Sequence, residues 1–286
     1  MAYHTVLVHV DTTARAPARI RVAAQLVRAS GGHLFGAALT GVSRLLYQRQ
    51  PEAADDPHFA LHLAFVRERA IQAVAAFRRE AEACALPSFE GRVIDDEAGA
   101  GLSLHARAAD LVVLGQAPPD TPAVPDFCPH VLLHAGRPVL LLPAQPAAPV
   151  DAASMAREVL VAWDASRAAG RALLGALPLL RQAGRVCIVV FDEGGKARLD
   201  AMAADPLPFL ARHQVRATLE VHALGGRRTL LQRDGVGAAL LALAAERHAG
   251  LLVMGAYGHS RMRETILGGA TRSVLAGMRL PVLMDH

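Results

Sequence analysis

The sequence predicts an α/β protein made of two tandem, doubly wound domains, each built on a five-stranded parallel sheet. Three observations predict this fold. The 286 residues suffice for two domains of roughly 150 residues. Short runs rich in Val, Ile and Leu alternate with longer segments of helical spacing, as in a parallel sheet that helices cover on both faces. The second half also repeats the pattern of the first.

Three pairs of segments carry the repeat and occur in the same order in both halves. The pairs are 5–11 with 158–164, 110–115 with 250–255, and 137–143 with 280–285. The offsets within the pairs are 153, 140 and 143 residues, so the duplicated unit has about 140 residues. The Pro- and Ala-rich stretch 144–153 lies between the copies and reads as a linker. We therefore expect one domain at 1–146 and a second at 155–286.

The second half shows the strand and helix pattern most clearly. Its strands are expected at 158–164, 186–191, 215–223, 250–255 and 281–285. Helices are expected at 167–183, with Ser166 as N-cap and Gly184 at the end, at 228–248 and at 269–278. In the first half, 59–84 has an apolar stripe typical of a long amphipathic helix. Five parallel strands with crossover helices give a doubly wound sheet.

The composition excludes several classes of protein. Lys+Arg 30 and Asp+Glu 26 leave a net charge of +4, and no long run of like charge offers a stripe for nucleic acid. The single lysine, Lys196, argues against a P-loop or a kinase site. Three cysteines without a C-x-x-C pair indicate neither a disulfide framework nor a zinc site.

The N-terminal sequence, the length of the apolar runs and the amino-acid composition indicate the cellular location and the source of the protein. The N-terminus leads directly into a strand without a signal peptide, and no apolar run is long enough to span a membrane. We therefore expect a cytoplasmic protein without membrane contact. The preference for Arg over Lys and the abundant Ala are typical of a GC-rich bacterial genome.

Two features of the second half fall where doubly wound sheets bind ligands, at the carboxyl ends of strands. One is Asp164, at the end of the opening strand. The other is the stretch 255–273, where Gly255, Gly258 and Gly268 follow the spacing G-x2-G-x9-G. Glycines let backbone N–H groups approach an anion, and the helix that follows adds the positive end of its dipole. A phosphate cradle and a tight turn with close helix packing both explain this pattern.

These residues make the second half similar to a universal stress protein domain, in the branch that binds ATP through G-x2-G-x9-G-[Ser/Thr]. Both halves together resemble the tandem form of that family. The resemblance implies that Asp164 contacts the adenine end of the nucleotide and that the glycines hold the phosphates and ribose. The implied nucleotide-binding residues are Asp164, Val190, Met254, Gly255, Gly258, Gly268, Gly269 and Ala270.

The sequence departs from the family motif at one position. Gly269 stands where the family has Ser or Thr, so a hydroxyl donor to phosphate is missing. A hydrogen bond to a charged group contributes about 1.5–3 kcal/mol, so binding of ATP should be weaker by tenfold or more. The backbone N–H of Gly269 remains, and Thr271 or Ser273 on the next turn are the candidates to replace the hydroxyl.

The first half keeps the aspartate, Asp11, but has lost the glycine loop. After Gly115 the chain carries four prolines within 116–125 and no glycine before Gly136. Prolines lack the N–H groups that a phosphate needs. We expect no nucleotide there, no measurable effect of replacing Asp11 on binding, and a structural or partner-docking role for this half.

Other polar residues give weaker indications. His58 and His62 form an i, i+4 pair without a third ligand, so no metal site is assigned. His259 lies inside the glycine loop with Arg261 and Arg263, where these side chains either screen phosphate charge or face solvent. The only tryptophan, Trp163, precedes Asp164.

Three functions are compatible with these features. The resemblance implies a stress-response regulatory protein that senses ATP, with Mg²⁺ as its companion, without rapid turnover. A slow ATP hydrolase is the second, with His259 as the visible candidate base, and a scaffold that binds no nucleotide is the third. No catalytic residue is assigned. We expect the halves to pack as a pseudo-dimer about a pseudo-twofold axis, with a homodimer of whole chains and an unidentified protein as further partners.

Overall fold

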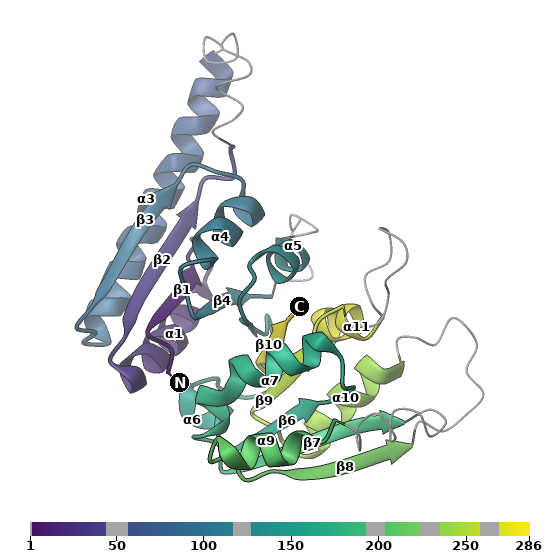
Figure 1. Ribbon diagram of the computed structural model, residues 1–286. Coiled ribbons are helices and arrows are strands. Elements are labelled where there is room, and N and C mark those ends of the chain that lie inside the picture. The colour runs from purple at the N-terminus through teal and green to yellow at the C-terminus, as the bar shows by residue number, and fades with distance from the viewer. Residues whose placement is uncertain (1, 44–56, 117–126, 193–203, 224–234, 258–268) are drawn as a thin grey trace. The chain divides into compact units, whose positions relative to one another are not determined.

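The computed structural model describes residues 2–43, 57–116, 127–192, 204–223, 235–257 and 269–286. The chain divides into two compact units, Ala2–Val139 and Leu140–His286. In both units, parallel strands alternate with helices along the chain (Figure 1). The α/β class expected from the sequence is confirmed.

The first unit has a parallel sheet in the order β3-β2-β1-β4. Its strands are β1 (Thr5–His9), β2 (His33–Leu39), β3 (Phe89–Ile94) and β4 (Leu111–Gly115). Its helices are α1 (Ala16–Ser30), α3 (Pro57–Ala83), α4 (Ala98–Ala106) and α5 (Phe127–His134). Helix α3 runs alongside β2 and β3 (Figure 1). The strand β5 (Val139–Leu142) begins at the boundary between the units.

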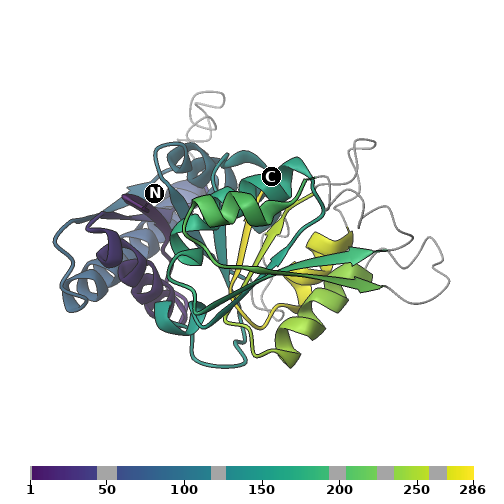
Figure 2. The same cartoon turned by 60° about the horizontal axis from the view of Figure 1, so that its bottom comes forward.

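The second unit has the equivalent order β10-β9-β6-β7-β8. Its strands are β6 (Glu158–Ala162), β7 (Arg185–Asp192), β8 (Thr218–Ala223), β9 (Leu251–Gly255) and β10 (Val282–Asp285). Its helices are α6 (Ala152–Met155), α7 (Arg167–Leu180), α9 (Pro206–Arg212), α10 (Gly235–Glu246) and α11 (Gly269–Gly277). Figure 2 shows α7 on one face of this sheet and α10 and α11 on the other. The sheet is therefore covered on both faces, as its apolar strands require.

Local sequence explains most of these elements. The central strands β6 and β9 are buried because Val and Leu point to both covered faces. Ser166 caps α7 as expected, since its Oγ accepts a hydrogen bond from the N–H of Ala169 at 3.1 Å. The helix ends earlier than expected, at Leu180, and Gly184 does not end it. Instead the N–H of Gly184 donates to the carbonyl of Ala156 at 2.7 Å, which fixes the chain as it enters β7.

Within the part of the chain that the structure describes, no helix is both long and apolar enough to cross a bilayer. The longest of the described helices, α3, has 27 residues, and its exposed side carries charged side chains such as Arg67 and Glu68.

Candidate functional site

Asp164 lies just beyond the carboxyl end of β6 in the second unit. Its side chain is exposed, and its Oδ1 accepts a hydrogen bond from the N–H of Ser166 at 2.9 Å. Ala165 between them has a φ of 58°, so the chain turns sharply here before α7 begins. This turn holds a carboxylate at the strand end, where the sheet architecture places ligands.

Gly255, the last residue of β9, lies against the first turn of α7. A Cβ added to Gly255 would be 2.5 Å from the backbone N of Ala169 and 2.7 Å from the carbonyl carbon of Ala168. Only glycine lets strand and helix approach this closely. The structure therefore gives this first motif glycine a packing role, whereas its contact with a nucleotide stays a prediction.

Thr271 joins the two described ends of the glycine-rich stretch. Its Oγ1 accepts a hydrogen bond from the N–H of Tyr257 at 3.2 Å, and the side chain is buried. Ser273 contacts α10 instead, because a Cβ added to Gly237 would lie 2.7 Å from the Cβ of Ser273. The Thr271 oxygen thus bonds to the strand end, and Ser273 packs on a neighbouring helix. Neither contact was predictable from the spacing of the motif.

The other expected site residues fall into three groups. Some lie in the hydrophobic core, some begin α11, and some lie outside the described residues. Val190 and Met254 have buried side chains in the hydrophobic core. Gly269 and Ala270 are half-buried and begin α11, whose first N–H groups have no acceptor within the helix. An anion is stabilised at such an end. The remaining predicted residues lie outside the described ones: Gly258, His259, Arg261, Arg263 and Gly268.

Trp163 is half-buried beside Asp164. Its backbone N–H donates to the carbonyl of Val189 at 2.9 Å, which ties the end of β6 to β7. The indole is the only one in the sequence, so the tryptophan emission of this protein reports on the strand end that carries Asp164.

Asp11 occupies the corresponding place in the first unit, but its carboxylate is bonded within the protein. Oδ2 lies 2.8 Å from Nη2 of Arg19, and Oδ1 accepts hydrogen bonds from the N–H and the hydroxyl of Thr13 at 2.9 and 2.5 Å. Burial opposes the negative charge, yet Arg19, His9 and Thr13 outweigh it and hold the pKa of Asp11 below its ordinary value.

Arg19 fills the space next to this aspartate. The residue is only 5% exposed, its Nε donates to the carbonyl of His9 at 2.7 Å, and Nη1 would lie 2.6 Å from a Cβ on Gly115. At the offset that relates Asp11 to Asp164, the second unit has the buried Ala172. Arg19 was not among the residues predicted for a site, although an arginine eight residues after Asp11, in the helix that follows the opening strand, was the available signal.

His9 should make the stability of the first unit depend on pH. Burial, and then the charge of Arg19, lower the pKa of His9 from 6.5 to about 4, so the folded state stays neutral where the unfolded state takes up a proton. The contribution of neutral His9 to the free energy of unfolding is therefore fully present above pH 6.5. As the pH drops from 6.5 towards 4, the free energy of unfolding decreases by on the order of 2–3 kcal/mol. Urea unfolding at pH 7 and pH 4.5 should show a larger loss for the wild type than for His9→Leu. Equal losses would contradict this assignment.

His58 and His62 lie exposed on α3. Among the residues for which the structure gives positions, no group of three or more His, Cys, Asp or Glu side chains gathers as a metal site would require.

Comparison with known proteins agrees with the fold. Residues 155–286 match the model of the universal stress protein family. A universal stress protein from Archaeoglobus fulgidus DSM 4304 has a TM-score of 0.70 and 18% identity, over 98% of this chain and 94% of that one. A functionally unknown protein from Pseudomonas aeruginosa PAO1 has a TM-score of 0.56 and 15% identity, over 99% and 92% of the two chains. No curated protein matches the chain.

Residues 155–286 are a universal stress protein domain, and the whole chain has the tandem α/β fold of the Archaeoglobus protein. The predicted resemblance to the universal stress protein family is therefore confirmed for the family of the second half and for the fold of the chain.

Proposed function

We propose that the second unit binds ATP or a related adenine nucleotide at the carboxyl ends of β6, β7 and β9, and that the protein acts as a stress-response sensor without rapid turnover. The observation that carries this proposal is the contrast between two equivalent aspartates. Asp164 is exposed at its strand end, whereas Asp11 is bonded to the buried Arg19. One chain should therefore bind one nucleotide.

The described residues fit such a ligand at both of its ends. The Asp164 carboxylate accepts hydrogen bonds and suits the amino-bearing adenine end. The N–H groups of Gly269 and Ala270 begin a helix of nine residues, where phosphate charge is stabilised. Bound ATP would bring Mg²⁺ held mainly by its own phosphates. We assign no catalytic residue, because His259, the candidate base of the hydrolase alternative, lies outside the described residues.

Titration with ATP while following the emission of Trp163 tests this function. We expect a saturable change in emission, and equilibrium dialysis should give one nucleotide per chain. Asp164→Ala should weaken binding about tenfold or more, since a hydrogen bond to a charged group contributes about 1.5–3 kcal/mol. Glu246→Ala is the matched control, because it removes an equal charge from an exposed position at the far end of α10.

The control should bind ATP as the wild type does. A flat titration, or equal affinities for the wild type and Asp164→Ala, would favour the scaffold that binds no nucleotide. Two nucleotides per chain would show that the first unit also binds.

A further inference from the structure

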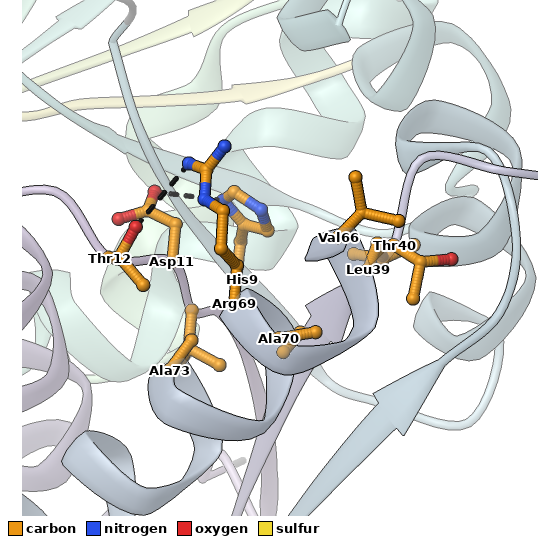
Figure 3. A pocket seen from close by; sticks show the side chains of 11 residues that line it. His9, Asp11, Thr12, Leu39, Thr40, Val66, Arg69, Ala70 and Ala73 are labelled. Atoms are coloured by element: carbon orange, nitrogen blue, oxygen red, sulfur yellow. Dashed lines mark hydrogen bonds and ion pairs between the residues drawn. The ribbon is translucent and has the colours of Figure 1, made fainter. Parts of the chain in front are cut away.

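The first unit contains a cavity of about 140 Å³ at the carboxyl ends of β1 and β2, beneath α3. Figure 3 shows Asp11 and Thr12 at one side of it and Leu39 and Thr40 at the other. The residues that line it are His9, Val10, Asp11, Thr12, Ala38, Leu39, Thr40, Val66, Arg69, Ala70 and Ala73. The cavity belongs to the half of the chain for which no ligand has been proposed.

Three alanines contribute to the apolar part of the lining. Ala38, Ala70 and Ala73 are each buried and end at Cβ, so they leave room between the strands and the helix. The β-branched side chain of Val66 lines the cavity from the same side of α3 (Figure 3). A cavity of this volume is large enough for a single six-membered ring.

Asp11 and Arg69 are the charged side chains among the residues that line the cavity. Asp11 and Arg19 form an ion pair at 2.8 Å, so their charges offset each other. His9 is neutral at pH 7, because burial lowers its pKa to about 4. Arg69 remains as a cation on the lining.

Two uncharged side chains contact the guanidinium of Arg69 at the cavity, so neither neutralises its charge. Its Nη2 donates a hydrogen bond to Oγ1 of Thr12 at 3.4 Å, a contact marked by a dashed line in Figure 3. Its guanidinium carbon is 5.8 Å from the centre of the Phe65 ring. Arg67, two residues earlier on the same helix and so on a different side of it, is instead paired with Asp95 at 2.9 Å. Among the described residues, no carboxylate forms an ion pair with Arg69.

We propose that this cavity binds a small monocarboxylate with a compact apolar body, with the carboxylate at Arg69 and Thr12 and the body against Val66, Ala70 and Ala73. A guanidinium is suited to a planar carboxylate because it offers paired N–H donors. The paired Asp11 does not repel such a ligand as a free aspartate would. This site lies in the other unit from the proposed nucleotide site and does not depend on it.

Benzoate and benzamide are the probes, since they share a shape and differ in charge. Ligand-observed NMR titration of the full chain should show saturable binding of benzoate and at least tenfold weaker binding of benzamide. Arg69→Met keeps the aliphatic stem and removes the charge, and it should weaken benzoate at least tenfold. Ala70→Leu should fill the cavity and have the same effect. Arg67→Met is the matched control and should bind benzoate as the wild type does.

Thermal unfolding shows which variants are folded before they are compared. The proposal is overturned if benzoate does not saturate at millimolar concentration, if benzamide binds equally, or if Arg67→Met weakens binding as much as Arg69→Met. It is also overturned if ATP displaces benzoate, because the cavity would then belong to a nucleotide. Unchanged emission of Trp163 on adding benzoate supports the placement in the first unit.

Discussion

Asp11→Ala is expected to lower the free energy of unfolding of the first unit by about 3 kcal/mol or more. The substitution removes the carboxylate that faces the Arg19 guanidinium at 2.8 Å and leaves that cation only 5% exposed. Removing one partner of a buried ion pair costs more than the pair itself contributes, because the remaining charge stays desolvated. Urea unfolding followed by circular dichroism measures the change.

A double-mutant cycle separates the cost of leaving the Arg19 guanidinium buried without a partner from the cost of losing the other contacts of Asp11. Arg19→Met alone and the double variant Asp11→Ala with Arg19→Met should each be more stable than Asp11→Ala, since neither buries a lone cation. Asp164→Ala is the control at the equivalent position, and it should change stability by less than about 1 kcal/mol because the side chain is exposed. A loss below 1 kcal/mol for Asp11→Ala would mean that water reaches Arg19.

These two aspartates illustrate what the sequence could predict of the site. Both were predicted at the carboxyl end of an opening strand, and the structure places both there. Their environments differ because of a residue on the following helix, Arg19 in one half and Ala172 in the other. The expectation that Asp11 takes no part in nucleotide binding stays a prediction, and the ion pair with Arg19 adds the prediction that replacing Asp11 destabilises the fold.

The fold was predictable because its signals are local. Apolar runs bounded by turns predicted all five strands of the second half, and Ser166 marked the start of α7. Two contacts of the sites join elements that are far apart in the sequence. Thr271 accepts a hydrogen bond from Tyr257, and the Arg19 guanidinium packs against Gly115. Neither composition nor spacing contains such contacts, since they depend on how strand ends and helices pack.

The last expected result is that Gly255→Ala destabilises the second unit by about 3 kcal/mol, at the upper end of the usual cost of overpacking. The added methyl would meet backbone atoms of Ala168 and Ala169 at 2.5–2.7 Å, and backbone cannot rotate away as a side chain can. Strand β9 and helix α7 must separate, and the turn that holds Asp164 lies at the start of that helix. Nucleotide affinity should therefore fall together with stability.

Gly170→Ala is the matched control, because it adds the same methyl to α7 where no heavy atom lies within 4 Å. It should raise stability by roughly 0.5–1 kcal/mol, since alanine favours a helix interior more than glycine does. The pair of variants decides between the two explanations of the first motif glycine. If Gly255→Ala abolished nucleotide binding at unchanged stability, the glycine would serve the phosphate alone; a loss of stability shows that the packing of β9 on α7 requires it.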